Sequence, residues 1–267
     1  MSVLTSEAVV LRTWPVHEAD LLVSFFTRDY GRLKGMAKAA LKSRKRFGGA
    51  LEPMTLARVW FAERPRQELV RLDQLEIVRS PLSAPVDQTR MAVLSFYAEV
   101  IDEALPERDP QETVFRLLAS VLEQTSAVKA ETGEPGVAQA SSSGPPSSGP
   151  WMALTYFSLW MTRLMGLLPD IGHCIVCGDV LVAGEVRFNA YADGLFCGVH
   201  ANGSGSGLSA DSWQLAQRML RAPASSFAGE AWSRKRGQDL RRFTVQTLER
   251  HLERKLKTAE AIARLGG

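Results

Sequence analysis

Two closely spaced pairs of ligand residues constrain this chain more than any other feature of its sequence. Cys174 and Cys177 form a Cys-x-x-Cys pair, and after nineteen intervening residues Cys197 and His200 form a second pair with the same spacing. A short turn of this kind aims both ligands at one ion, and two such pairs can clamp a tetrahedral Zn²⁺. The sequence therefore predicts one structural Zn²⁺ ion held by Cys174, Cys177, Cys197 and His200.

A structural role is favoured because four protein ligands leave no coordination position for an activated water. A disulfide framework is disfavoured, since the chain has three cysteines and two of them are close together. Two alternatives remain open: the cysteines are reduced and carry no metal, or His173 replaces His200 as the nitrogen ligand. Between the pairs, residues 186–191 and 195–196 flank an Asp193-Gly194 turn, which predicts a β-hairpin.

The first eighty residues have the pattern of a small β-barrel. Short apolar runs of the β type alternate there with charged or turn-forming segments. The runs cover residues 8–11, 21–26, 33–37, 56–61 and 69–78. Five strands in this length match an OB-fold, a barrel that binds oligonucleotides across one face and through its loops.

Beyond Pro81 the apolar residues follow helical spacing. Predicted helices carry the stripes Met91, Leu94, Ala98 and Ile101, then Val114, Leu117, Leu118, Val121 and Leu122. Residues 151–168 are apolar but interrupted by Thr155, Thr162 and Arg163, which predicts a buried core helix rather than a membrane span. Two further helices are expected over about residues 209–222, with Ser209 as the N-cap, and 238–265.

The predicted fold class is α+β: an N-terminal OB-fold β-barrel followed by a mostly α-helical domain that carries a small zinc-binding module. We expect the barrel at residues 1–80, the helical domain at 81–170 and 204–267, and the zinc module at 171–203. Residues 130–150 are rich in Gly, Ser and Pro and are expected to form a flexible linker. Residues 203–207 form a small glycine-rich connector. Residues 1–10 lack the pattern of a secretory signal, so a cytoplasmic location is expected.

One segment of the predicted barrel is strongly basic, although the net charge of the chain is only +3. Its candidate DNA-binding residues are Arg28, Arg32, Lys34, Lys38, Lys42, Arg44, Lys45 and Arg46, opposed only by Asp29. Such a density of cations attracts a polyanion, and the nearby Tyr30 and Phe47 rings could stack on unpaired bases. The alternatives are a solvated basic loop and a Phe47 that belongs to the core.

A second basic cluster lies near the C-terminal end. It comprises Arg234, Lys235, Arg236, Arg241, Arg242, Arg250, Arg254, Lys255 and Lys257. This cluster could extend a path for nucleic acid, but the interspersed Glu249 and Glu253 favour an ordinary solvated helix face.

No enzymatic motif accompanies these features. His17-Glu18 lacks the second histidine of a zincin, no His-x-Glu accompanies the cysteines, and residues 202–207 contain neither a nucleophile elbow nor a phosphate-binding lysine. A non-enzymatic DNA-binding protein is therefore favoured. A zinc-dependent hydrolase or deaminase and a purely structural adaptor are the competing hypotheses.

The N-terminal motifs resemble those of the RecO family of DNA repair proteins. The resemblance rests on Glu7-Ala8-Val9-Val10-Leu11-Arg12, Glu18-Ala19-Asp20-Leu21-Leu22-Val23, Phe26-Thr27-Arg28-Asp29-Tyr30-Gly31-Arg32-Leu33 and Lys45-Arg46-Phe47-Gly48-Gly49-Ala50-Leu51-Glu52-Pro53. It extends in order over the whole chain and is densest in the first eighty residues. Two departures stand out: His200 occupies the position of a fourth cysteine, and residues 130–150 look like an insertion.

The resemblance implies a set of activities and partners. Members of the family bind single- and double-stranded DNA, anneal complementary strands, and act with RecR so that RecA replaces the single-stranded DNA-binding protein SSB. It also implies a contact between the helical domain and the C-terminal tail of SSB, and a location at the nucleoid. Some relatives lack the metal cysteines, which fits a structural role for the ion.

Overall fold

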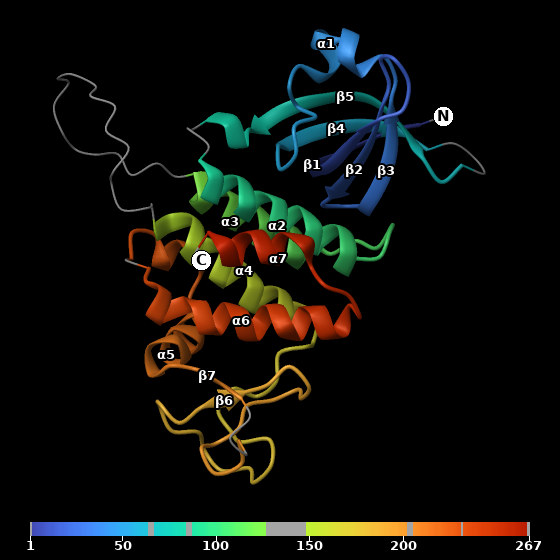
Figure 1. Ribbon diagram of the computed structural model, residues 1–267. Coiled ribbons are helices and arrows are strands. Elements are labelled where there is room, and N and C mark those ends of the chain that lie inside the picture. Colours follow the sequence, from blue (N-terminus) through green and yellow to red (C-terminus); the bar gives the residue numbers. More distant parts are fainter. Residues whose placement is uncertain are drawn as a thin grey trace, which may run out of the picture.

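Five strands form a closed barrel at the N-terminal end of the chain (Figure 1). The computed structural model describes residues 2–63, 67–83, 87–126, 148–201, 205–230 and 232–265. The strands are β1 (Val3–Pro15), β2 (Leu21–Thr27), β3 (Gly31–Ala37), β4 (Leu56–Ala62) and β5 (Val70–Arg79). Their order is β1-β2-β3-β5-β4, with β1 paired to both β2 and β4 and with β3 parallel to β5. The predicted barrel is confirmed, and its strands extend the predicted runs by up to several residues.

Alternation along the strands gives the barrel two apolar faces. Val10, Val23 and Phe25 belong to a core cluster inside the barrel, whereas the neighbouring Val9 and Phe26 belong to the core of the helical domain. Successive side chains of a strand point to opposite faces, so one strand contributes to both cores. The barrel is therefore packed against the helices by its own outward residues, and the Phe26 and Phe115 rings lie 5.7 Å apart.

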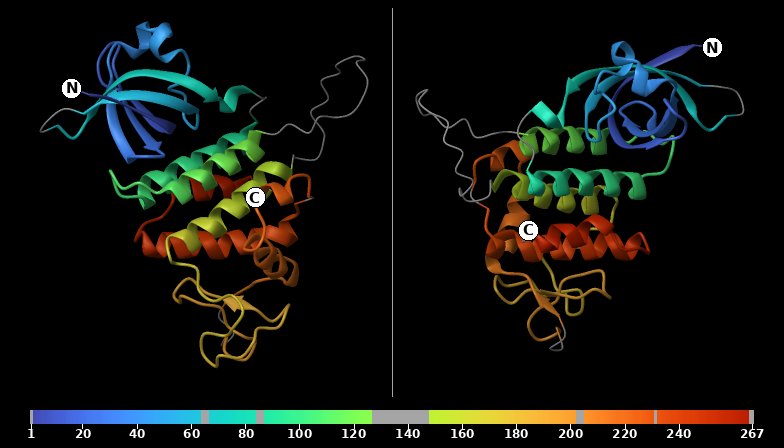
Figure 2. Two further views of the ribbon diagram at one scale, coloured as in Figure 1. Left: turned by 180° about the vertical axis from the view of Figure 1, so that it is seen from behind. Right: turned by 45° about the horizontal axis from the view of Figure 1, so that its top comes forward.

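The helical domain follows the barrel. Its helices are α2 (Gln88–Ala104), α3 (Glu112–Ser126), α4 (Ser148–Leu164), α5 (Ala210–Met219), α6 (Arg234–His251) and α7 (Lys257–Arg264). Short 3₁₀ turns occur at η1 (Ala40–Lys42), η2 (Pro81–Ser83) and η3 (Ala224–Phe227), and a four-residue helix α1 (Arg44–Phe47) lies between β3 and β4. Figure 2 shows the helices as a layer between the barrel at one end of the molecule and the loop-rich module that contains β6 (Arg187–Phe188) and β7 (Ser206–Gly207) at the other.

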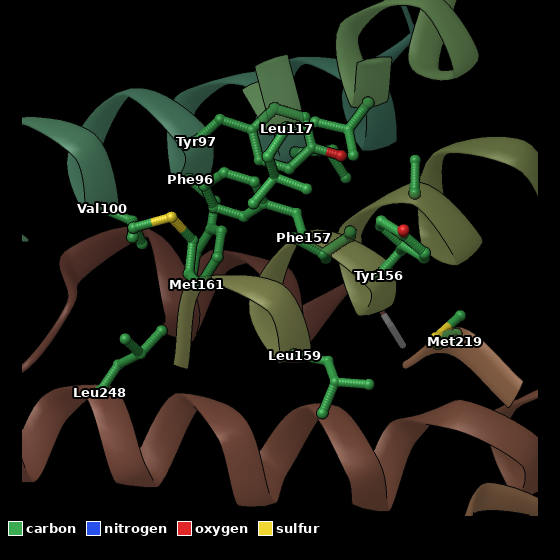
Figure 3. Close-up of a cluster of buried hydrophobic side chains, with 14 of the residues drawn as sticks. Phe96, Tyr97, Val100, Leu117, Tyr156, Phe157, Leu159, Met161, Met219 and Leu248 are labelled. Atoms are coloured by element: carbon green, nitrogen blue, oxygen red, sulfur yellow. The ribbon is translucent and has the colours of Figure 1, made fainter. Parts of the chain in front are cut away.

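Helix α4 runs through the centre of the helical domain (Figure 3). Phe157 packs against Phe96 and Tyr97 of α2, with ring centroids 6.3 and 4.5 Å apart. The hydroxyls that interrupt this apolar stretch donate to carbonyls of the same helix, Thr155 to Trp151 and Ser158 to Leu154, both at 2.8 Å. Local hydrogen bonds of this kind remove the cost of burying a hydroxyl. The predicted core helix is confirmed, and among the described residues no helix has the length and apolar character needed to cross a membrane.

Four sequence predictions differ from the structure at their boundaries. The single helix expected over residues 238–265 is two helices, because Glu253 has a left-handed backbone (φ 53°) and the chain turns between α6 and α7. The last residues of the predicted linker, 148–150, form the first turn of α4, while residues 130–147 lie outside the described part. Helix α4 ends earlier than expected, before Gly166, whose φ of 73° is a common way to end a helix. In the connector, residues 206–207 form β7, and residues 203–204 lie outside the described part.

Candidate nucleic-acid interface and metal centre

The four predicted metal ligands converge. One ligand atom each from Cys174, Cys177, Cys197 and His200 lies within 4.8 Å of all the others. His200 Nδ1 is 3.3 Å from Cys197 Sγ and 3.8 Å from Cys174 Sγ. A tetrahedral Zn²⁺ with bonds of about 2.0–2.3 Å would separate its ligand atoms by roughly 3.5–3.8 Å. The residues therefore fit one such ion, bound through Nδ1 of the histidine.

His173 is not part of this cluster. Its Nδ1 lies 2.7 Å from a carboxylate oxygen of Asp170, and its side chain is half exposed. The cluster that could hold an ion therefore contains His200 and not His173.

Backbone geometry explains how the two short turns position their sulfurs. The Gly178 amide donates to the Cys174 carbonyl at 2.9 Å, and the His200 amide donates to the Cys197 carbonyl at 3.2 Å. Gly178 has a φ of 74°, a conformation that glycine adopts without strain. The turns are joined because the Ile175 amide donates to the Leu195 carbonyl at 2.9 Å.

The electrostatics of the sulfurs also suit a cation. Burial raises the pKa of Cys174, but hydrogen bonds from backbone amides of Cys177, Cys197 and Val176 outweigh it and lower the pKa to about 6. The Asp179 amide lowers the pKa of Cys177, yet desolvation and hydrogen bonding with the Asp179, Cys174 and Cys197 side chains raise it to about 11. Two neighbouring thiolates therefore repel each other, and a divalent ion bound between them would relieve that repulsion.

The metal module is attached firmly to helix α6. Phe188 stacks edge-on against Phe243 at 5.3 Å, and Arg250 donates to the carbonyls of Ala190 and Ala192 at 3.1 and 3.0 Å. The hairpin predicted inside the module is only partly present. Arg187 and Phe196 pair through two backbone hydrogen bonds of 2.9 and 2.8 Å, but the regular partner of β6 is β7.

The eight predicted DNA-binding cations divide into two groups. Arg28, which follows β2, and Arg32 and Lys34 of β3 form ion pairs with the helical domain. Arg28 contacts Glu112 at 2.8 Å and Lys34 contacts Glu107 at 2.8 Å. Arg32 donates to the Leu105 carbonyl at 3.0 Å and lies 3.3 Å from Asp102. These three side chains connect the barrel to the helices, a role that sequence reasoning did not foresee.

The remaining group surrounds helix α1, on the side of the barrel away from the helices (Figure 1). Lys38, Lys42, Arg44 and Lys45 are exposed, and none of them forms an ion pair within the described part of the chain. Arg46 is partly buried and holds the segment together, donating to Ser43 Oγ at 3.0 Å and to the Lys38 carbonyl at 2.6 Å. We call Lys38, Lys42, Arg44 and Lys45 the α1 cation group.

Of the two rings proposed to stack on bases, one is not available for it and the other is partly covered. Phe47 is buried in the barrel core, so the stacking prediction for it is wrong and the core alternative is correct. Tyr30 packs edge-on against Phe61 at 5.3 Å. Burial of an aromatic ring in the barrel core stabilises the fold, and for Phe47 this takes precedence over exposure of the ring to a ligand.

The second basic cluster is largely engaged within the protein. Arg236, Arg250, Arg254 and Lys255 each pair with a nearby carboxylate. Arg241 is buried beside Trp151 and Trp232, 5.1 and 5.6 Å from their ring centroids, and burial lowers its pKa to about 9. The side chains of Arg234 and Lys235 lie outside the described part. Of this cluster, Lys257 is exposed and lines a cavity between the barrel and the helices.

Comparison with known proteins shows to which family the chain belongs. The model for the N-terminal domain of recombination protein O matches residues 1–81, and the model for its C-terminal domain matches residues 85–133 and 144–260. The chain belongs to the RecO family. A protein named DNA repair protein RecO from Koribacter versatilis is 49% identical over 260 residues, which cover 97% of this chain and 98% of that protein.

More distant RecO proteins align over the same length. The protein from an Anaeromyxobacter species is 31% identical, over 97% of this chain and 95% of its own length. The protein from Syntrophotalea carbinolica is 27% identical, over 98% of this chain and 94% of its own length. The resemblance noted in the N-terminal motifs is thus confirmed over both domains, and the chain is a DNA repair protein of this family.

Proposed function

We propose that this RecO-family chain binds single- and double-stranded DNA, anneals complementary strands and, with RecR, helps RecA replace SSB on single-stranded DNA. The observation that carries the DNA-binding part is the α1 cation group: Lys38, Lys42, Arg44 and Lys45 are exposed together on one side of a closed barrel. Cations without an internal partner are free to neutralise phosphates and to release condensed counterions.

The rest of the barrel surface supports the same location. OB-folds use the outer face of strands β2 and β3 together with neighbouring loops. In this chain that face is partly covered, because Ser24, Arg32 and Lys34 contact the helical domain. The uncovered α1 cation group and the adjoining loops are the part of the barrel that supports a DNA path.

Annealing follows from such a surface without covalent chemistry. Cations bound to two phosphate backbones offset their mutual repulsion, and contacts with phosphates leave the base edges free to pair. We propose accordingly that the protein is not an enzyme and acts at the nucleoid in the cytoplasm.

The metal is proposed to be Zn²⁺ with a structural role. Three sulfurs and one imidazole nitrogen suit Zn²⁺ and complete its tetrahedral shell. The ion would hold Cys174, Cys177, Cys197 and His200 together in a module with few buried residues of its own. RecR and the C-terminal tail of SSB are proposed as partners on the basis of family membership.

The test is strand annealing measured across a salt titration, with and without SSB and RecR. The proposal predicts annealing that weakens steeply as salt rises, because phosphate contacts are electrostatic. A protein that binds Zn²⁺ and partners but has no affinity for DNA would instead support the structural adaptor, and turnover of a nucleotide or amide substrate would support the zinc enzyme.

A further inference from the structure

A cavity lies between the barrel and the helical domain. Its volume is about 450 Å³, a size typical of small-molecule sites. Its apolar lining includes Leu11, Trp14, Met54, Leu82, Met91 and Leu94. Trp14, Leu82 and Met91 are among the exposed large apolar residues of the protein, so the cavity is open to solvent at these side chains.

Trp14 is the exposed aromatic side chain of the described barrel residues. It lies near the end of β1, and 38% of its surface is exposed, whereas Phe47 is buried and Tyr30 packs on Phe61. An exposed indole beside an apolar cavity offers a face on which a planar ring can stack.

Two segments of the chain connect the cavity wall to the α1 cation group. The loop that follows α1 continues into the cavity wall at Glu52, Pro53 and Met54. The loop that follows Trp14 is bonded to the basic segment, since Asp20 Oδ1 accepts from the Ala39 amide at 2.7 Å and the Ala19 carbonyl accepts from the Leu41 amide at 3.1 Å.

The lining of the cavity contains charged side chains of both signs. Arg12 and Lys257 contribute cations to the lining, and Lys257 forms no ion pair within the described residues. Of the two carboxylates, Glu99 is buried and accepts hydrogen bonds from the start of α7. The exposed Glu52 could accept from the exocyclic amino group of a base, a contact that carboxylates make with cytosine.

We infer that this cavity holds one unpaired nucleobase of a bound single strand, stacked on Trp14, while the α1 cation group and Lys257 contact the phosphates on either side. This inference rests on the proposed DNA binding and deepens it. A base can enter only when it is unpaired, so the cavity favours single strands over duplex. Holding one base leaves its neighbours free to pair with a second strand.

The test compares three variants of the full chain: Trp14→Ala, Trp14→Phe and, as a matched control, Tyr191→Ala. Tyr191 is an exposed aromatic residue of the metal module at the opposite end of the molecule. The probes are a fluorescent thymidine oligonucleotide, the same strand carrying abasic residues, and a duplex of equal length, with binding followed by fluorescence anisotropy.

The inference predicts that Trp14→Ala weakens thymidine-strand binding about tenfold, the order expected for one lost stacking contact. Trp14→Phe should retain most of the affinity, and Tyr191→Ala all of it. Duplex affinity and the salt dependence should not change, because no cation is removed. The abasic strand should bind the unaltered protein and Trp14→Ala equally, and a photoreactive iodouracil strand should cross-link to Trp14.

Two results would overturn the inference in different ways. If the unaltered protein binds the thymidine strand and Trp14→Ala and the abasic strand change nothing, the cavity holds no base, although the proposed function stands. If Trp14→Ala leaves DNA binding intact but abolishes binding of an apolar peptide, the occupant is a protein segment. Absence of DNA binding by the unaltered protein would instead contradict the proposed function itself. Thermal unfolding of each variant checks that a loss is not caused by misfolding.

Discussion

The hydroxyl of Ser24 donates a 2.8 Å hydrogen bond to the carboxylate of Asp102, joining strand β2 of the barrel to helix α2. Ser24 is fully buried, and the same carboxylate lies 3.4 Å from Arg12 and 3.3 Å from Arg32. One side chain of the helical domain therefore contacts three residues on the outer face of the barrel.

Replacing this carboxylate should loosen the junction between the two domains. We expect Asp102→Ala to lower the free energy of unfolding by about 2–4 kcal/mol, because it leaves the buried Ser24 hydroxyl without its acceptor and removes one of the carboxylates that face the largely buried Arg32 guanidinium. Urea unfolding followed by circular dichroism measures the change. Glu107→Ala is the matched control: its pairs with Lys34 and Arg32 are more exposed, so its loss should stay below about 1 kcal/mol. Equal losses in both variants would contradict the assignment of Asp102 as the main contact.

The division of the basic residues makes a second prediction. The triple variant Lys42→Ala, Arg44→Ala, Lys45→Ala should weaken single-strand binding and reduce the slope of log affinity against log salt by about 0.7 for each lost phosphate contact. Salt-dependent anisotropy titrations measure both quantities.

A charge-matched control removes three cations that already face carboxylates. Arg254, Lys255 and Arg264 pair with Glu103, Glu249 and Glu260. Their replacement by alanine changes the net charge equally but should leave the slope nearly unchanged. A similar loss of slope in both variants would mean that net charge, and not the α1 cation group, determines DNA affinity.

Metal removal should act on the module rather than on the barrel. Cys177→Ser removes one of the four ligands, and we expect the purified variant to lose its Zn²⁺ and to melt at a lower temperature, since metal binding contributes directly to the stability of small metal modules. Atomic absorption and calorimetry measure the two effects. His173→Ala should keep the metal, because its ring faces Asp170; loss of metal in that variant would contradict the ligand assignment.

Acid should release helix α7 from helix α2. Burial raises the pKa of Glu99, but hydrogen bonds from the Thr258 hydroxyl and from the amides of Thr258 and Lys257 outweigh it, so the pKa lies below its ordinary value of 4.5. A depressed folded-state pKa means that this stabilisation is complete above about pH 4.5 and is lost as the pH falls further.

The variant Glu99→Gln should show the same loss at neutral pH. We expect about 1–3 kcal/mol, because a hydrogen-bonded buried carboxylate is replaced by a neutral amide. Hydrogen exchange of residues 257–264 measures the release of α7. If exchange there stays as slow in Glu99→Gln as in the unaltered protein, Glu99 does not hold the helix.

Much of this architecture could be predicted from the sequence because its signals are local. Cysteine spacing determines which side chains can share an ion, and short apolar runs indicate the strands, so the five barrel strands and the cluster of Cys174, Cys177, Cys197 and His200 could be predicted. The core helix α4 was predicted because an apolar surface on all sides requires complete burial.

What the sequence could not predict depends on contacts between distant segments. The basic residues from Arg28 to Arg46 look alike along the chain, and only the fold shows that Arg28 and Lys34 face Glu112 and Glu107. The turn at Glu253 was hidden because Leu252 and Leu256 continue the helical spacing across it. The cavity beside Trp14 had no signal at all, since its walls come from β1, η2, α2 and α7.

The helical domain partly covers the outer face of β2 and β3, so one side of the barrel is less accessible than the side that carries α1. In the proposed mode of binding, a polynucleotide at α1 would have the barrel behind it and solvent in front, so a complementary strand would approach from the solvent side. This difference between the two sides of the barrel would let two DNA strands meet in a fixed relative orientation. The orientation would then be set by the shape of the protein alone.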